Sequence, residues 1–176
     1  MRKKAVVFCS SSMTIDSKYN EAAVAAIDVL CAAGYDIVSG GGAKGTMDVI
    51  AARAAHNGVG NIGVLPRFMA QFRHPDLTEL IWTDTMSERK EKMREGTSLA
   101  LALPGGIGTL DELAETLCLA KLGLYTGRVI ALNVDGFYDS FKALLDHYVA
   151  TGMYSAQDLS LISFPSTIEE LSGVVE

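Results

Sequence analysis

Cysteine is scarce in this sequence, and long apolar runs are missing. The three cysteines, Cys9, Cys31 and Cys118, are odd in number, lie far apart and sit within apolar runs. This pattern is typical of reduced core residues in a cytoplasmic protein rather than of a disulfide framework or a zinc site. The apolar run after the basic tip turns polar at Ser10, which is too early for a signal peptide. No run approaches the roughly 18 apolar residues of a membrane span, so we expect a cytoplasmic protein without membrane contact.

An excess of basic residues is also missing. The formal net charge is −6 at pH 7, which disfavours a nucleic-acid groove because such a groove requires clustered Lys and Arg. This net charge offers no long-range attraction to an anionic small molecule. A phosphate site in this protein must therefore be built locally, from backbone donors and a few cations.

Several catalytic and cofactor motifs do not occur. The glycine loops lack the GxGxxG spacing with an acidic residue about twenty positions later, and neither GxxxxGK[ST] nor GxSxG is present. His56, His74 and His147 lack the spacing of metal ligands. A pyridoxal-phosphate enzyme needs a Schiff-base lysine, for which the sequence offers no motif. We therefore expect no metal and no cofactor, and we assign any catalysis to carboxylates and cations.

The composition is typical of one globular domain. The chain has 176 residues, of which 49% are hydrophobic and 20% charged, and no linker or low-complexity segment interrupts residues 1–176. Short apolar runs predict strands at 4–9, 35–38, 60–65, 77–82, 99–103 and 128–134, with a short extended piece at 161–164. This alternation of strands with helices predicts an α/β fold, a doubly wound parallel sheet with helices on both faces.

Apolar residues at helical spacing predict the helices between these strands. They are expected at 19–33, 46–58, 87–96, 110–122 and 137–150, with a terminal helix from Ser166 that has Glu169 in the capping-box position. The helix at 137–150 is expected to bury Phe141, Leu144, Leu145 and Tyr148. Residues 67–75 lose the pattern and are interpreted as a loop or short helix near the site.

Residues 99–115 predict a strand, a glycine loop and the start of a helix. Gly105, Gly106 and Gly108 follow the apolar run, and leucine then recurs at helical spacing. Glycines let backbone N–H groups approach a ligand, and a helix start offers unpaired donors and a positive dipole end. This combination predicts an anion site, most naturally for phosphate. The alternative is a tight turn in which Thr109 and Glu112 form a helix capping box.

Three other turns also follow predicted strands. A second glycine loop spans residues 39–46, a serine turn spans residues 10–12, and a third turn spans residues 83–86. In a doubly wound sheet, ligands bind beyond the carboxyl ends of the strands. All four turns can therefore open on the same edge of the sheet.

Charged residues on two helices have both a structural and a chemical interpretation. Asp111, Glu112 and Glu115 crowd the start of the helix after residues 105–108, where acids complement the helix dipole. Arg89 and Lys90 lie near the start of the helix at 87–96, where cations oppose the dipole at a cost of a few tenths of a kcal/mol. A solvent-exposed face with i,i+4 ion pairs would explain the charges at 87–96 only in part. The position of Arg89 and Lys90 therefore indicates a role beyond such pairing.

Two longer motifs resemble those of one enzyme family. Residues 104–112 (PGGIGTLDE) fit the pattern PGGxGTxxE, and residues 86–90 (MSERK) fit MxxRK. Residues 8–12, 40–47, 63–66 and 132–138 agree as well, so the match covers essentially the whole chain in order. The sequence is similar to the LOG (Lonely Guy) family of cytokinin-activating phosphoribohydrolases, whose members are often labelled lysine decarboxylases.

The resemblance implies a Rossmann-like homodimer with its sites near the interface. It implies hydrolysis of the N-glycosidic bond of a nucleoside 5′-monophosphate, AMP or N6-prenylated AMP, to a free base and ribose 5-phosphate. Arg89 and Glu112 are the implied catalytic pair, and a carboxylate beside the anomeric carbon suits an oxocarbenium-like transition state. The residues expected to bind the substrate or its phosphate are Ser11, Gly41, Gly42, Met86, Lys90, Gly105, Gly106, Gly108, Thr109 and Asp111.

Four positions depart from the family pattern. Asp48 stands where Gly is common, and Gln71, three residues before His74, stands where Glu is common; Ser87 replaces a common His and Lys121 a common Gln. None of the four belongs to the implied catalytic pair. They leave open whether the base is a prenylated adenine, plain adenine or another base.

The rival interpretation is a non-catalytic carrier of a nucleotide or a pterin cofactor with a related fold. The presence of both Arg89 and Glu112 favours the enzyme, because a carrier has no evident need for a carboxylate beside the sugar. For the assembly, four apolar positions on or near the two charged helices belong either to the core or to the implied two-fold interface. They are Met93, Leu117, Leu124 and Tyr125.

Overall fold

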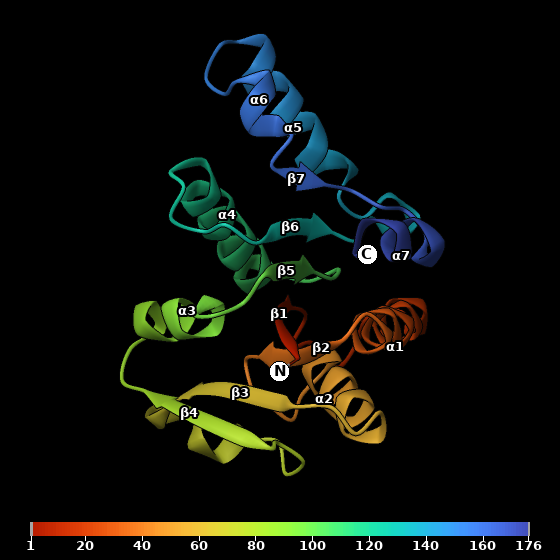
Figure 1. Cartoon of the computed structure of the whole chain (residues 1–176), viewed down its shortest axis with the longest axis vertical. Helices are drawn as coiled ribbons and strands as arrows, with labels where there is room; N and C mark the ends of the chain where they lie inside the picture. The colour runs from red at the N-terminus through yellow and green to blue at the C-terminus, as the bar shows by residue number, and fades with distance from the viewer. Residues whose placement is uncertain (1, 176) are drawn as a thin grey trace.

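The computed structural model describes residues 2–175 and contains one parallel sheet. Its seven strands lie in the order β4-β3-β2-β1-β5-β6-β7, and every neighbouring pair is parallel (Figure 1). The strands are β1 (Lys3–Phe8), β2 (Tyr35–Ser39), β3 (Asn61–Pro66), β4 (Glu79–Thr83), β5 (Leu99–Ala102), β6 (Arg128–Ala131) and β7 (Ile162–Ser163). All the predicted strands are confirmed. β6 is shorter than predicted because the chain leaves the ladder at Asn133, whose N–H donates to the Pro165 carbonyl.

Helices connect successive strands. They are α1 (Ser17–Ala32), α2 (Thr46–His56), α3 (Met86–Arg94), α4 (Ile107–Lys121), α5 (Asp139–Ala150), α6 (Ala156–Leu159) and α7 (Ile168–Val175), with 3-10 turns η1 (Arg67–Phe72) and η2 (Val134–Gly136). The turn η1 forms where a loop or short helix is expected. The short helix α6 has no counterpart among the predicted elements. No helix in the part of the chain that the structure describes is long and apolar enough to cross a membrane.

Alternate residues of the strands face two separate layers of helices. In β1, Ala5 and Val7 pack with α1, α2 and α7, whereas Val6 and Phe8 pack with α3, α4 and α5. Figure 1 shows α1, α2 and α7 on one side of the sheet and α3 and α4 on the other. Because strand side chains alternate between the two faces, continuous apolar runs are required to fill both layers. The predicted doubly wound, Rossmann-like fold is thereby confirmed.

Two predicted helix starts are wrong by a few residues. Helix α4 begins at Ile107 with Gly106 at its N-cap, so Thr109 lies inside the first turn and forms no capping box with Glu112. At α7 the cap lies one residue later than predicted. The Glu170 N–H donates to Thr167 Oγ1 (3.2 Å), and the Ser166 N–H donates to the Glu170 carboxylate (2.7 Å).

The exposure of several side chains also differs from prediction. On α5, Leu145 is buried, but Leu144 and Tyr148 are 43% and 40% exposed. The reason is position: α5 lies beside α6 beyond the last strands (Figure 1), where it has a narrower surface to cover. Cys118 is exposed rather than buried, while Cys9 and Cys31 are partly buried; all three are free thiols.

The topology places a crevice at the carboxyl ends of β1 and β5. The chain runs outward from β1 through β2 and β3 to β4, and then returns across the sheet through α3 to β5. The loops after β1 and β5 therefore lead away in opposite directions. Ligands of doubly wound folds bind at such a switch point.

Candidate active site

Two adjoining hollows lie at this edge of the sheet. The first has a volume of about 140 Å³ and is lined by Arg89, Glu112 and the residue pair Gly108–Thr109. The second has a volume of about 290 Å³ and shares Ser11 and Arg89 with the first. The serine turn and both glycine loops contribute to one region, as predicted. The turn at residues 83–86 lines neither hollow, but the helix that follows it contributes Arg89.

Arg89 is buried at the ends of two strands. Its side chain extends from α3, and its guanidinium donates from Nε to the Val64 carbonyl and from Nη2 to the Gly40 carbonyl, both at 3.0 Å. Burial lowers the pKa of Arg89, while the nearby Glu112 carboxylate raises it. The two backbone carbonyls and this carboxylate are the partners of the Arg89 charge. They explain why a cation stands near the start of α3, where the helix dipole disfavours it.

Gly40 creates the space for this guanidinium. A Cβ built on Gly40 would collide with Nη2 of Arg89. The backbone of the glycine loop therefore approaches the arginine more closely than any other residue type would allow. The glycine is required here for contact rather than for an unusual backbone angle.

Glu112 faces Arg89 from the neighbouring helix α4. Burial raises the pKa of Glu112 to about 7, against the opposing influence of the Arg89 charge. Cys9 lines the same hollow, and burial together with the Glu112 charge raises the pKa of its thiol above the ordinary range. The thiol is therefore neutral, and Glu112 is the titratable group of this hollow that changes charge near neutral pH.

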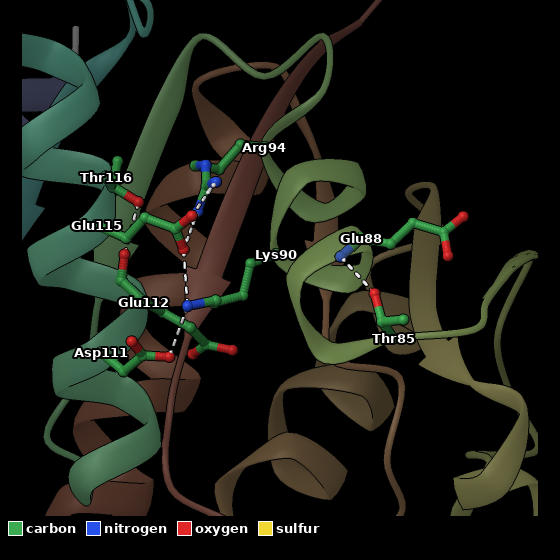
Figure 2. Close-up of polar contacts among 8 residues, drawn as sticks. All are labelled: Thr85, Glu88, Lys90, Arg94, Asp111, Glu112, Glu115 and Thr116. Atoms are coloured by element: carbon green, nitrogen blue, oxygen red, sulfur yellow. Dashed lines mark hydrogen bonds and ion pairs between the residues drawn. The ribbon is translucent and has the colours of Figure 1, made fainter. Parts of the chain in front are cut away.

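Lys90 joins α3 to α4 instead of facing the hollow. Its Nζ lies 2.8 Å from Asp111 Oδ2 and 2.9 Å from Glu115 Oε2, and Glu115 also contacts Nη2 of Arg94 at 3.1 Å. Figure 2 shows this network, with the Glu112 carboxylate outside the dashed contacts. Hydrogen bonds to the two carboxylates raise the pKa of Lys90. Lys90 and Asp111, both expected to bind the substrate or its phosphate, are paired with each other and line neither hollow.

The start of α4 presents unpaired donors to the first hollow. The first helical hydrogen bond runs from the Leu110 N–H to the Gly106 carbonyl (3.1 Å), so the amides at 107–109 precede the hydrogen-bonded ladder. Among residues 2–175, the buried Thr109 Oγ1 has no hydrogen-bond partner. Gly105 is required beside it, because a Cβ there would collide with the Thr109 side chain. The geometry suits an anion.

Gly41 and Gly42, in the earlier glycine loop, have different roles. Gly41, at φ 69°, donates to Ser39 Oγ and accepts from the His74 N–H, and it does not line either hollow. Gly42 lines the second hollow. Met86, at the start of α3, is 44% exposed and lies outside the lining of both.

Sequence reasoning did not find the apolar wall of the second hollow. That wall consists of Met47, Leu65, Met69 and Phe72. Lys44 lies at its edge, with Nζ 4.1 Å from the centre of the Phe72 ring. These residues come from α2, β3, η1 and a loop, so no spacing pattern links them; only the unusual mixture of aromatics and cations at 67–75 pointed to this region. Within residues 2–175, no group of three or more His, Cys, Asp or Glu side chains is placed to hold a metal ion.

Comparisons with known proteins identify similar sequences. A family model described as "Possible lysine decarboxylase" matches residues 47–174. The cytokinin riboside 5′-monophosphate phosphoribohydrolase LOG2 of Arabidopsis thaliana is 34% identical over 99% of this chain and 83% of its own length. The probable cytokinin riboside 5′-monophosphate phosphoribohydrolase LOGL3 of Oryza sativa subsp. japonica is 35% identical, with the same coverage.

Solved structures show the same fold at lower identity. The molybdenum cofactor carrier protein of Chlamydomonas reinhardtii superposes with a TM-score of 0.76 at 18% identity, covering 99% of this chain and 96% of that one. The molybdenum cofactor binding protein of Rippkaea orientalis gives a TM-score of 0.73 at 20% identity, with the same coverage. With relatives above 30% identity along nearly its whole length, the chain belongs to the LOG family, which the possible-lysine-decarboxylase model describes.

Proposed function

We propose that this protein is a phosphoribohydrolase that cleaves the N-glycosidic bond of AMP or an N6-modified AMP. One observation carries the proposal: the chemical character of the lining changes in order along the two hollows. Gly108 and Thr109 line only the first hollow, and Arg89 lines both. Of the apolar wall, Met47 and Met69 line both hollows, whereas Leu65 and Phe72 line only the second. A nucleoside monophosphate has the same order of phosphate, ribose and base. The bond to be broken then falls beside Arg89 and Glu112.

The reaction follows from these positions. The α4 amides and the Thr109 hydroxyl hold the phosphate, and this remote binding places the anomeric carbon in the first hollow. Glu112, when ionised, stabilises positive charge on the sugar or takes a proton from the attacking water. Arg89 is fixed by two carbonyls. Its charge favours the ionised form of Glu112, against the effect of burial.

The base belongs in the second hollow. Its wall of Met47, Leu65, Met69 and Phe72 is apolar, and the volume of about 290 Å³ has room for a purine with a small apolar N6 substituent. The cytokinin riboside monophosphates named for the plant relatives carry such substituents. We therefore propose N6-modified AMP as the preferred substrate class.

Two alternatives fit the site less well. A carrier, as in the structural neighbours, would not need a buried carboxylate beside Arg89. A lysine decarboxylase would need an amine able to form a Schiff base, yet Lys90 is held as a cation by two carboxylates, which raise its pKa. The buried pair of Arg89 and Glu112 is what favours hydrolysis.

We also propose a cytoplasmic homodimer. Of the four apolar positions considered for the interface, Met93, Leu117 and Tyr125 belong to the core, whereas Leu124 is 72% exposed beside the 69% exposed Leu122. Such an exposed apolar pair, next to α3 and α4, suits contact with a second copy. Three free thiols, one of them exposed, suit a reducing compartment.

The substitution Glu112→Gln tests the proposed reaction. The variant should bind AMP normally but release base at least about 100-fold more slowly, because positioned acid–base groups contribute factors of that size. Because burial raises the pKa of Glu112 to about 7, wild-type kcat/KM should rise as the pH increases through 7 and the carboxyl group ionises. Chromatography of the released base, with AMP and N6-prenyl-AMP, measures both effects.

The control is Glu21→Gln, which changes an exposed carboxylate on α1 and should leave release unchanged. Undiminished release by Glu112→Gln would contradict the role of this carboxylate. Tight nucleotide binding by the wild type without any release would instead support the carrier.

A further inference from the structure

A buried histidine joins the two walls of the second hollow. His74 is 3% exposed, and its Nε2 lies 3.2 Å from Asp48 Oδ1 on the first turn of α2. Its Nδ1 accepts a hydrogen bond from the Asp76 N–H at 3.1 Å. Because Nδ1 is an acceptor, Nε2 carries the ring proton, and Asp48 Oδ1 is the carboxylate oxygen beside it.

His74 directly follows the segment that carries one wall. Met69 and Phe72 belong to η1, and Met47, the neighbour of Asp48, belongs to the opposite wall on α2. The end of η1 is tied to the glycine loop by backbone groups: the Ala43 N–H donates to Phe72 (2.7 Å), and the His74 N–H donates to Gly41 (2.9 Å). The Asp48–His74 contact adds a side-chain link between η1 and α2.

We propose that Asp48 and His74 are positioning residues that hold η1 against α2 and thereby set the affinity for the base. They do not take part in bond cleavage, which occurs in the neighbouring hollow. This inference rests on the proposed function, because it takes the second hollow as the base site. It assigns a role to Asp48, a position at which this chain departs from the family pattern.

Burial makes this contact stronger than an ordinary surface pair. The His74 side chain is 4% exposed and that of Asp48 is 55% exposed, so the histidine end of the contact is shielded from water. The other end of η1 has a contact of similar chemistry between Arg67 and Asp84, at 3.3 Å, but those side chains are 67% and 78% exposed. Pairs as exposed as this contribute little, so Asp84 provides a matched control.

The experiment compares Asp48→Ala, Asp48→Asn and Asp84→Ala in the full-length protein. Calorimetry in the Glu112→Gln background, which is expected to bind AMP without cleaving it, measures affinity for AMP, which carries the base, and for ribose 5-phosphate, which lacks it. Asp48→Ala should weaken AMP binding and raise KM by about 3- to 10-fold, because only the His74 end of the lost contact is buried. Ribose 5-phosphate affinity and kcat should stay within about twofold, because the first hollow is unchanged. Asp48→Asn retains an acceptor oxygen and should restore AMP binding, and Asp84→Ala should match the wild type.

Hydrogen exchange supplies a readout that does not depend on activity. Asp48→Ala should speed amide exchange in residues 67–76 but not in α4, because only η1 loses a contact. Equal losses of AMP and ribose 5-phosphate affinity, or a normal AMP affinity in Asp48→Ala, would overturn the inference while the proposed function stands. Wild-type protein that binds neither ligand would refute the proposed function, and the base role of this pair with it.

Discussion

At the residue scale, the site is dominated by one buried pair of opposite charges. Arg89 is satisfied by two backbone carbonyls, whereas desolvation raises the pKa of Glu112 to about 7 despite the facing cation. Burial disfavours the charged carboxylate, and the arginine only partly offsets that effect. The result is a carboxyl group that is poised between its two protonation states at neutral pH, as acid–base chemistry requires.

Substitution of Gly40 tests the placement of Arg89 without changing Arg89 itself. In Gly40→Ala the new methyl group would collide with the guanidinium, which must move because the backbone cannot. We expect kcat/KM to fall by about 10- to 100-fold, since small displacements of a positioned group are costly. Steady-state kinetics and the melting temperature of the variant measure the effect.

Gly173→Ala on α7 is the control for this substitution, because an added Cβ there meets nothing within 4 Å. It should keep full activity and stabilise the helix by about 0.5–1 kcal/mol. If Gly40→Ala folds and retains wild-type kcat/KM, the position of the guanidinium does not matter for the reaction.

At the element scale, α3 and α4 are held together by ion pairs that also orient the site. Lys90 contacts carboxylates of Asp111 and Glu115, and Glu115 in turn contacts Arg94, whose side chain is only 7% exposed (Figure 2). Arg89 and Glu112 project from these same two helices. Any change in the spacing of α3 and α4 therefore changes the distance between the two proposed catalytic groups.

Two carboxylate substitutions separate the contributions of this network. Glu115→Ala leaves the buried Arg94 without its carboxylate, so we expect a loss of about 2 kcal/mol in the free energy of unfolding. Asp111→Ala removes a carboxylate that is 59% exposed and pairs only with Lys90, and it should cost about 0.5 kcal/mol or less. Urea unfolding of both variants measures the difference. Equal losses would show that burial of Arg94 does not govern the strength of the network.

At the scale of the whole molecule, the return of the chain across the sheet creates the site. The crossing from β4 to β5 opens the crevice between the ends of β1 and β5, and it brings α3 beside α4. Leu122 and Leu124, which follow the end of α4, are exposed. The proposed catalytic groups and the proposed interface are thus neighbours in the fold.

The proposed dimer predicts the effect of a charge at this surface. Leu124→Lys should shift the protein from dimer to monomer at micromolar concentration, because a charge would be buried in the contact. Sedimentation velocity measures the change. Met153→Lys, at another apolar side chain that is 76% exposed, should remain dimeric. A wild-type monomer at the same concentration would contradict the proposed interface.

Local patterns were sufficient for the strands, most helices and the loops of the site. Apolar runs and glycine turns depend on neighbours in sequence, so β1 to β7 and the start of α4 were predicted within a few residues. The exact helix caps were harder to predict from the sequence. Thr109 is a residue type that often caps helices, yet α4 begins two residues before it. Burial on α5 was overestimated, since periodicity reveals a face but not how much surface it meets.

The amino-acid sequence by itself determined the alternation of elements, the glycine loops and the motifs that contain Arg89 and Glu112. Only the tertiary structure decided which cation lines the hollows, because Arg89 reaches carbonyls of β3 and of the loop after β2, while its neighbour Lys90 reaches α4. It also decided the apolar wall and the Asp48–His74 contact. The physical reason is the same in each case: these properties depend on burial and on distances between residues far apart in the chain, which no local pattern encodes.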